Sequence, residues 1–377
     1  MKILITYLTG IGNTILFIPT LRALHHQIPD AVVDIVVRHQ ESKDILERVN
    51  SSRKIYVLNS HNPKTAVQKI QLLRTLRQER YDMNLTAFPA NRMEFNVLSF
   101  LIGAKRRIAI RYQVGHYETL GFLQTESVEV PENYHDIDQN LSLLAPLGVN
   151  KLLYAEKDIS WNLREDEIAY AEDFLSKQQL TPQAILIGFH PGCNPAQGNI
   201  FKRWPTAYFA RLGDLLQEQF GAQILLFGDQ SETPLKEAIR QAMKYPPLIP
   251  DNRPLLQIAA LIKRCHLFVT NDSGLMHVAA AMGVPIISLF GPSDPRRNAP
   301  YGDKHTVLRA DLPCIPCNTY PHYQFGGSYV RCIYKGDRQG YCMQSISVET
   351  VYETIVRNYA HLFKTVTSNH HAEGVKA

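Results

Sequence analysis

The sequence predicts an α/β protein with two doubly wound, Rossmann-like domains, and three observations lead to this prediction. At 377 residues the chain is too long for one compact core of usual size, so two domains are expected. Short apolar runs alternate with segments of helical period in both halves, as in parallel sheets covered by helices on both faces. The hydrophobic content of 45% and charged content of 20% are those of an ordinary globular protein.

The first half of the chain alternates strand-like runs with helical patterns. Apolar residues at 15, 18, 21 and 24, and again at 70, 73 and 76, have helical spacing. The runs expected to form strands are Ile3–Tyr7, Val32–Val37, Ile55–Leu58, Met83–Phe88 and Arg107–Ile110. We assign residues 1–150 to an N-terminal domain, with the boundary between Leu147 and Trp161.

The second half repeats this alternation. The expected strands are Ala184–Phe189, Gln223–Phe227, Leu267–Thr270 and Pro285–Phe290. The expected helices are Pro205–Gln219, Ser231–Met243, Leu255–Lys263, Leu275–Met282 and an amphipathic helix from about Val348 to Phe363. We assign residues 151–346 to the C-terminal domain and expect residues 367–377 to form a disordered tail.

Composition and termini restrict where the protein works. The chain has no run of the ~18 apolar residues that span a bilayer, and Lys2 is followed by a short apolar run and glycines, unlike a signal peptide. We therefore expect a cytoplasmic protein; peripheral attachment at the inner face of the cell membrane stays open. The net charge of +5 suits an anionic ligand or membrane surface and does not call for nucleic acid.

In open parallel sheets ligands bind beyond the carboxyl ends of the strands, so the informative residues follow strands. The first such loop is Thr9-Gly10-Ile11-Gly12-Asn13-Thr14. A dinucleotide fingerprint needs a third glycine where this chain has Ile15, which disfavours a nicotinamide-dependent oxidoreductase. A Walker loop would need Gly-Lys-Ser/Thr, which is absent. A ligand contact and a tight strand-to-helix turn both remain open.

The second loop carries two adjacent cations. Lys202 and Arg203 stand just before the helix that Pro205 opens, where cations and backbone N–H groups can meet a phosphate. The alternative is a solvated loop anchored by Trp204.

The sharpest motif is the stretch Asn271-Asp272-Ser273-Gly274-Leu275-Met276-His277. A strand delivers Asp272 to its carboxyl end. Ser273 and Gly274 then open a helix whose first N–H groups suit an anion, and His277 lies one turn in. Alternatively Asp272 is a simple N-cap and His277 a core histidine; the clustering of polar groups at one strand end argues against both.

The segment VTNDSGLMHVAAAMGVPIISLFGPSDP, with FKRWP before it and TGIGNTILFIPTLRAL at the start, resembles the family 9 glycosyltransferases, the heptosyltransferases of bacterial lipopolysaccharide synthesis. The resemblance covers most of the chain in the right order and spacing. It implies a GT-B fold of two facing Rossmann-like domains, with the acceptor on the first and the nucleotide-sugar on the second. It also implies that the last helix, 347–366, packs back on the N-terminal domain.

The resemblance implies inverting transfer of a heptose from ADP-heptose or a similar nucleotide-sugar to a lipopolysaccharide-core or related glycan, with no metal or other cofactor. Lys202 matches the family's phosphate-binding lysine and Asp272 the acidic residue that grips the donor. The other residues matched to donor binding are Arg203, Ser273, Gly274, His277 and Gly228. Gly10, Gly12, Asn13 and Thr14 lie on the acceptor side.

Asn13 departs from the family pattern, in which this loop usually ends in Gly-Asp and the aspartate is the proposed base. An amide can position a hydroxyl but cannot accept its proton. Three interpretations follow. Another group supplies the base, or departure of the sugar is so advanced in the transition state that a base matters less. The third is that the chain is a catalytically weakened nucleotide-sugar-binding homologue. The candidate bases are His116, Glu118, His135 and Asp136.

Two further features stay open. Cys314, Cys317, Cys332 and Cys342 could make a zinc site, although their uneven spacing favours reduced cysteines or a redox-sensitive loop. A basic stretch could meet a phosphorylated acceptor or anionic lipid, or be a solvated face. Its members are Lys64, Lys69, Arg74, Arg77, Arg80, Arg92, Lys105, Arg106, Arg107 and Arg111.

Overall fold

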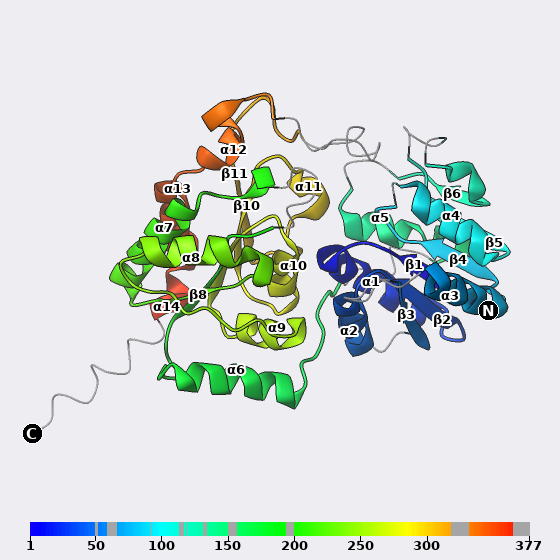
Figure 1. The fold of residues 1–377 in the computed structure, drawn as a ribbon, viewed down its shortest axis with the longest axis horizontal. Coiled ribbons are helices and arrows are strands. Elements are labelled where there is room, and N and C mark those ends of the chain that lie inside the picture. Colours follow the sequence, from blue (N-terminus) through cyan, green and yellow to red (C-terminus); the bar gives the residue numbers. More distant parts are fainter. Residues whose placement is uncertain are drawn as a thin grey trace, which may run out of the picture. The chain divides into compact units, whose positions relative to one another are not determined.

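The structure is a computed structural model of the 377-residue chain (Figure 1). It describes residues 1–49, 52–58, 66–90, 92–112, 117, 119–130, 134–149, 157–193, 200–317 and 332–364. Contacts divide these into two compact units. Unit 1 consists of Met1–Asn162 with Arg296–Asn298, and unit 2 holds Leu163–Pro295, Ala299–Cys317 and the described residues from 332 onward.

Unit 1 is built on a parallel sheet of six strands in the order β3-β2-β1-β4-β5-β6. The strands are β1 (Lys2–Tyr7), β2 (Val32–Val37), β3 (Lys54–Val57), β4 (Met83–Thr86), β5 (Arg106–Ile110) and β6 (Glu126–Val128). In register, Ile3 of β1 lies between Val33 of β2 and Met83 of β4. The strand order reverses beside β1, which makes the β1/β4 carboxyl edge the place where this topology binds ligands.

The helices of unit 1 are α1 (Ile11–Gln27), α2 (Gln40–Val49), α3 (Ala66–Gln78), α4 (Met93–Ile102) and α5 (Asp136–Ser142), with 3₁₀ turns η1 (Gly121–Leu123) and η2 (Ala145–Leu147). The helix α1 is buried at every position from Thr14 to Leu24 except Arg22, because α2 and α5 pack against it. A helix that is apolar on all sides belongs in a core, so α1 holds its first turn rigidly against the sheet.

Unit 2 has a parallel sheet of five strands in the order β11-β10-β9-β7-β8. Its strands are β7 (Leu186–His190), β8 (Gln223–Leu226), β9 (Leu267–Asn271), β10 (Ile286–Phe290) and β11 (His305–Arg309). Here the order reverses between β7 and β9, where His190 pairs with Thr270. The ends of these two strands are therefore the expected ligand edge of unit 2.

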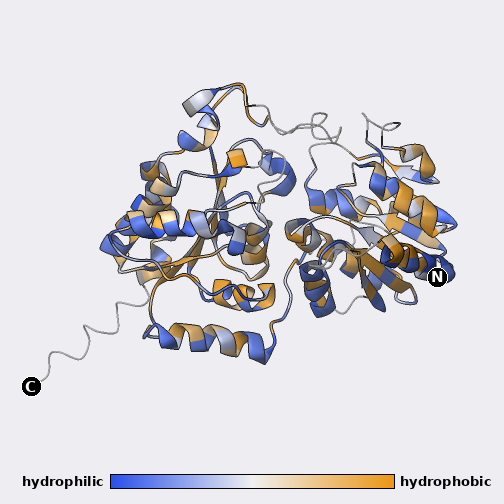
Figure 2. Ribbon diagram, in the orientation of Figure 1, coloured by the Kyte–Doolittle hydropathy of each residue, from blue (hydrophilic) through white to orange (hydrophobic). Residues whose placement is uncertain are grey.

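The long helices of unit 2 are α6 (Glu165–Lys177), α7 (Thr206–Phe220), α8 (Thr233–Ala242), α9 (Leu255–Lys263), α10 (Gly274–Ala281) and α13 (Val348–Tyr359). Short elements are η5 (Gln230–Glu232), η6 (Gly336–Arg338), α12 (Tyr341–Gln344) and α14 (His361–Lys364). The short helix α11 (Pro295–Asn298) begins at the end of a unit 2 segment, and its last three residues belong to unit 1. Figure 2 shows apolar residues gathered on the strands and on α9, while α6 alternates between apolar and polar residues along its length.

The last helix corrects a sequence-based expectation. Residues 347–366 were expected to pack on the N-terminal domain, but the apolar face of α13 lies in the core of unit 2. Val351 and Ile355 are fully buried there beside Leu212 and Leu216 of α7. The apolar spacing of a helix predicts a buried face but does not identify the partner. The expected tail 367–377 lies outside the described residues.

The expected strands are confirmed to within about two residues at each end, whereas β6, β11 and α6 were not anticipated. The helix expected over Ser231–Met243 is preceded by η5, whose N-cap Asp229 accepts the backbone N–H of Ser231 at 2.7 Å. No helix in the described part of the chain is long and apolar enough to cross a bilayer.

Candidate functional site

The carboxyl edge of β7 and β9 collects the charged residues that the sequence singled out in unit 2. Lys202 Nζ lies 2.6 Å from Asp272 Oδ2, and the two side chains are 14% and 5% exposed. Burial raises the pKa of Asp272, but the charge and hydrogen bond of Lys202 outweigh it, so that this pKa lies below its usual value. The site therefore holds an ionised carboxylate and an ammonium group side by side.

Asn271, the last residue of β9, fixes the loop that carries Lys202. Its side-chain oxygen accepts the backbone N–H of Trp204 at 3.0 Å, and its amide donates to the carbonyl of Pro191 at 2.8 Å. The indole of Trp204 is buried and donates to the carbonyl of Ile346 at 2.8 Å. Lys202 is thus held two residues from an anchor and does not sit on a free surface loop.

The first turn of α10 provides the anion-binding part of this edge. Ser273 is its N-cap in an extended conformation, and its side chain makes no capping bond to the helix. The leading N–H groups of an α-helix have no partner within the helix, and the helix dipole favours negative charge there. His277, one turn in, is 3% exposed and interacts electrostatically with Asp272.

Arg203 extends the cationic side of the site. One of its terminal nitrogens donates to the carbonyl of Cys193 at 3.0 Å. Its Nε is buried and has no hydrogen-bond partner among the described residues. A guanidinium with unused donors next to Lys202 fits the recognition of a phosphate group.

Sequence reasoning placed His190 in the loop Phe189-His190-Pro191-Gly192 but gave it no role, and it missed Glu232. His190 Nδ1 lies 2.9 Å from Ser273 Oγ, and its Nε2 lies 3.1 Å from Glu232 Oε2. All three side chains are buried. A histidine directly after a strand was a usable signal, but its carboxylate partner is 42 residues away in the chain.

Two glycines make room for that carboxylate. A Cβ on Gly192 would lie 1.8 Å from Glu232 Oε1, and a Cβ on Gly228 would lie 2.7 Å from Glu232 Oε2. Gly228, expected to contact the donor, also has φ of +145°, a conformation that favours glycine. In unit 2 these glycines serve the close approach of Glu232 to two strand-end loops.

In unit 1 the opening loop is polar but uncharged. Gly10 is the N-cap of α1 with φ −82° and ψ 177°, and a Cβ there would meet nothing within 4 Å. Thr14 is buried, with its hydroxyl 2.8 Å from that of Ser42. Gly12 and Asn13 are half-buried, and Asn13 makes no side-chain hydrogen bond to a described residue.

The candidate bases near this loop are differently placed. His116 and Glu118 lie outside the described residues. His135 is the N-cap of α5, and its Nδ1 accepts the backbone N–H of Ile137 at 3.3 Å. Asp136 is 4% exposed and lies 3.2 Å from an Arg297 nitrogen, so its carboxylate is engaged in a buried ion pair.

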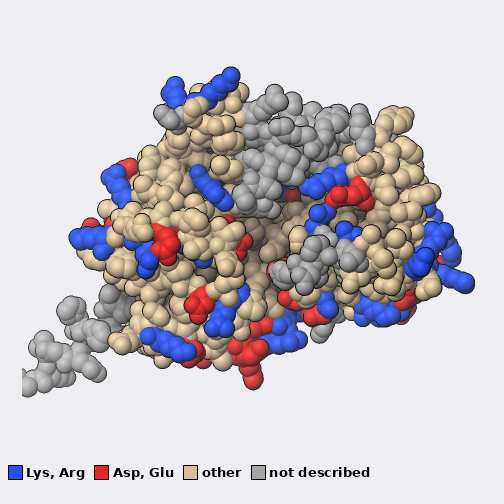
Figure 3. Space-filling model, viewed as in Figure 1, with Lys and Arg blue, Asp and Glu red and all other residues tan. Residues whose placement is uncertain are grey.

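Ion pairs neutralise part of the basic stretch of unit 1. Lys105 lies 2.9 Å from Asp82, Arg106 lies 2.6 Å from Glu126 and Arg111 lies 3.0 Å from Glu129. Figure 3 shows both signs of charge interspersed on the face in view. The described residues of this stretch, which exclude Lys64, fit a solvated, paired face better than an anion-binding patch.

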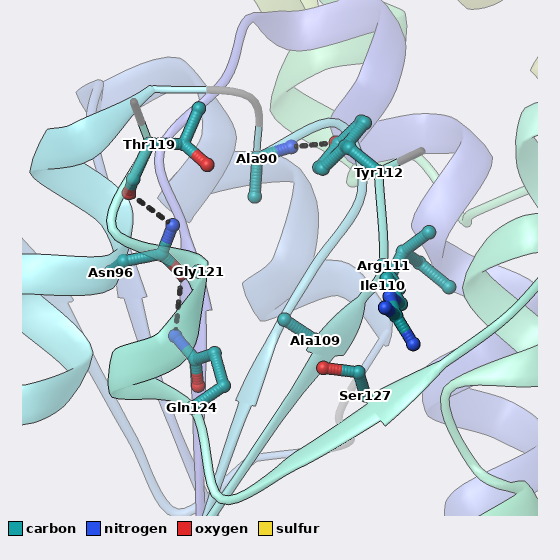
Figure 4. Close-up of a pocket in the computed structure, with 10 residues that line it drawn as sticks. All are labelled: Ala90, Asn96, Ala109, Ile110, Arg111, Tyr112, Thr119, Gly121, Gln124 and Ser127. Carbon is teal, nitrogen blue, oxygen red and sulfur yellow. Dashed lines mark hydrogen bonds between the residues drawn. The ribbon is translucent and has the colours of Figure 1, made fainter. Parts of the chain in front are cut away.

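A small polar pocket lies at the ends of β5 and β6 (Figure 4). Asn96 is buried in it, donates to the carbonyl of Thr119 at 2.7 Å and accepts from Gln124 at 2.6 Å. The remaining lining residues are Ala90, Ala109, Ile110, Arg111, Tyr112, Gly121 and Ser127. Because these hydrogen bonds satisfy the buried amide groups within unit 1, the pocket by itself indicates no ligand.

The described cysteines are free. The residues that the structure describes contain no group of three or more His, Cys, Asp or Glu side chains arranged to hold a metal ion. Burial, followed by the neighbouring cysteines, raises the pKa of Cys317 and of Cys342 to about 11. A bound metal ion would deprotonate such thiols, so the zinc site stays a prediction from the sequence.

Comparison with known proteins gives a consistent result. The family described as "Glycosyltransferase family 9 (heptosyltransferase)" matches residues 69–324. Lipopolysaccharide heptosyltransferase 2 of Escherichia coli is 27% identical over 321 residues, covering 82% of this chain and 88% of that protein. Lipooligosaccharide heptosyltransferase 2 of Haemophilus influenzae is 38% identical over 141 residues, which is 36% of this chain and 40% of that protein.

Solved structures agree in fold. A family 9 glycosyl transferase from Veillonella parvula has a TM-score of 0.74 at 25% identity, covering 96% of this chain and 97% of that chain. The ADP-heptose lipopolysaccharide heptosyltransferase II of Escherichia coli has a TM-score of 0.69 at 22% identity, covering 96% and 98%. The two parallel-sheet units and these matches confirm the GT-B fold expected from the sequence.

Proposed function

This chain belongs to glycosyltransferase family 9 and is a glycosyltransferase, and we propose that it moves a heptose-type sugar from ADP-heptose to a lipopolysaccharide-core or related cell-surface glycan. The proposed transfer inverts the anomeric carbon and needs no metal. The heptosyltransferases named among its relatives support the sugar and acceptor class. The observation that carries the proposal is the buried Lys202–Asp272 pair beside the first turn of α10.

On the donor side, the proposal gives each charged group a task. The bond between the anomeric carbon and the diphosphate oxygen breaks, and its electron pair moves onto the diphosphate. Lys202, Arg203 and the first N–H groups of α10 balance this developing charge without a metal ion. When Lys202 also contacts the diphosphate, Asp272 accepts hydrogen bonds from the donor.

On the acceptor side, Asn13 positions the attacking hydroxyl, and the space beside Gly10 admits it. The oxygen forms the new bond to the anomeric carbon and its proton passes to another group or to solvent. Of the four candidate bases, His135 and Asp136 are held by other contacts, and His116 and Glu118 lie outside the described residues. We favour a transition state in which sugar departure is well advanced, so that the group which takes the proton need not be a strong base.

The acceptor class also bears on location. A lipopolysaccharide-core acceptor is lipid-linked, so the proposal places the protein in the cytoplasm with peripheral contact at the inner face of the cell membrane. No nucleic acid is involved.

A turnover assay tests the proposal. Purified chain is incubated with ADP-heptose and a core-oligosaccharide acceptor, with and without EDTA, and ADP release and the anomeric configuration of the product are measured. We expect ADP release that needs the acceptor, resists EDTA and gives an inverted product. The second candidate function is a nucleotide-sugar-binding homologue without turnover, and it rests on Asn13. It predicts that the chain binds ADP but releases no ADP from ADP-heptose in the assay.

A further inference from the structure

A buried line of three side chains runs behind the donor edge of unit 2. Glu232 from η5 contacts Nε2 of His190 at 3.1 Å, and Nδ1 of His190 contacts the hydroxyl of Ser273 at 2.9 Å. His190, Glu232 and Ser273 are 4%, 6% and 9% exposed. Buried polar groups that are fully connected fix one another's orientation, so this line determines how Ser273 is presented at the start of α10.

The Glu232 end of the line is constructed to hold a negative charge. Gly192 and Gly228 leave the space that its carboxylate fills, and the backbone N–H of Asp229 donates to Oε2 at 3.2 Å. Burial raises the pKa of Glu232, but the hydrogen bond and charge of His190 outweigh it, and the pKa is lowered. An ionised Glu232 requires that Nε2 of His190 carries a hydrogen.

The protonation of the other ring nitrogen decides which way the Ser273 hydrogen points. In neutral His190, Nδ1 accepts, so the hydroxyl hydrogen of Ser273 points inward. In the imidazolium, Nδ1 donates to Ser273 Oγ, and the hydroxyl hydrogen becomes available to a ligand. Thr270, 3.2 Å from Ser273 Oγ, donates its own hydrogen to the carbonyl of Asn271, so it cannot donate to Ser273 and instead competes with the ligand as a weaker, neutral acceptor.

We propose that Glu232 and His190 are positioning residues that set the direction of the Ser273 hydroxyl, and that binding of a nucleoside diphosphate recruits the protonated form of His190. Binding of the ligand is then coupled to uptake of a proton. The inference rests on the proposed function, because it takes the diphosphate of the donor as the ligand at α10. Its chemistry is general: an oxyanion favours a hydroxyl that donates, and its charge favours a protonated imidazole.

Other charged groups surround the line. Arg203 interacts electrostatically with Glu232, and so does Lys236, which donates to the carbonyl of Gly228 at 2.9 Å. Asp272, which pairs with Lys202 and interacts electrostatically with His277, precedes Ser273 in the chain. Within this set only the protonation of His190 changes the donor that Ser273 offers, because His190 alone contacts both Ser273 and Glu232.

Calorimetry of ADP binding in buffers of different ionisation enthalpy tests this coupling. Near pH 7.5 the wild type should take up a fraction of one proton per ADP, and its affinity should fall with rising pH by up to about tenfold per pH unit. His190→Gln and Glu232→Gln should both bind ADP more weakly and lose this proton uptake. Comparison between variants cancels the titration of ADP itself.

The control is His266→Gln, which replaces a half-buried histidine at the opposite end of β9, where its Nδ1 accepts the backbone N–H of Leu186 at 3.2 Å. It should keep the wild-type proton uptake. The inference is overturned if the wild type takes up no proton on binding ADP, or if folded His190→Gln still takes one up. In both cases ADP binding would still support the donor site. Failure of the wild type to bind ADP contradicts the proposed function, and this inference with it.

Discussion

The carboxyl edges of the two sheets have the same topology and opposite chemistry. Both sheets are parallel and reverse their strand order beside their first strand. The edge of unit 2 holds a buried ion pair, Lys202 with Asp272, and a buried carboxylate, Glu232, in contact with His190. In unit 1 the loop after β1 is neutral, with Thr14 bonded to Ser42 and Asn13 half-buried. The charged groups at this edge, Arg38 and Asp136, are paired with Glu94 and Arg297. The topology thus determines where a ligand binds, while buried charge determines which ligand and which chemistry.

Unit 1 does contain charged networks, but at the amino end of its sheet. Glu79 meets Lys2, Arg53 and Lys54 there, and hydrogen bonds from these cations hold the pKa of Glu79 far below its usual value. Asp34 pairs with Arg53 at the same end. These pairs therefore stabilise the sheet away from the ligand edge, while the loop after β1 itself offers hydrogen-bonding groups and no charge.

Removing the buried cation of unit 2 should have the largest effect. Lys202→Met should lower kcat/KM by about 10²–10³-fold, because the leaving diphosphate loses its main counter-charge. It should also lower the free energy of unfolding by about 3–5 kcal/mol, because Asp272 is left buried and unpaired. Steady-state kinetics and denaturant titration measure the two effects.

Two further variants separate these effects. Lys202→Met with Asp272→Asn should recover stability but not activity, and Lys244→Met, at a lysine whose side chain is 65% exposed, should change neither. Turnover of Lys202→Met within threefold of wild type would remove the assigned role.

The glycines of the two edges should respond differently to the same substitution. Gly192→Ala places a methyl group against Glu232 and should cost about 1–3 kcal/mol of unfolding free energy. Gly10→Ala meets open space and no positive φ, so it should stay within about 0.5 kcal/mol but raise KM for the acceptor. Equal effects on stability from both substitutions would contradict the geometry described for the two loops.

Acid should weaken unit 2 through its buried carboxylates. The pKa values of Asp272 and Glu232 are lower in the folded protein than usual. Their contribution is therefore complete above the unfolded pKa of about 4 and is lost as the pH falls through the folded values. In a Trp161→Phe background, Trp204, the other tryptophan of the chain, reports unit 2. The denaturant concentration at the unfolding midpoint, reported by Trp204, should decrease as the pH is lowered below about 4. The decrease should be less steep in the Lys202→Met/Asp272→Asn variant, and an equal slope in both would contradict this assignment.

The sequence sufficed for what depends on local pattern. The strand ends and the Asp272–His277 motif were located correctly because polar residues directly after apolar runs mark the carboxyl edge of a parallel sheet. Long-range partners could not be predicted in this way. Glu232 reaches His190 only through the fold, and the apolar face of α13 does not reveal that α7 covers it. The fold therefore follows largely from periodicity, while the site needs the contacts between distant segments.

The central claim is that the donor edge supports turnover although Asn13 supplies no base. Its most direct measurement is kcat with ADP-heptose and a core acceptor for wild type, Asn13→Ala and Asn13→Asp. We predict measurable wild-type turnover, a loss of about tenfold in Asn13→Ala, as for one positioning hydrogen bond to the acceptor, and a rate for Asn13→Asp within about tenfold of wild type. A silent wild type that Asn13→Asp restores to activity would contradict the account and show that the chain binds its donor without transferring the sugar.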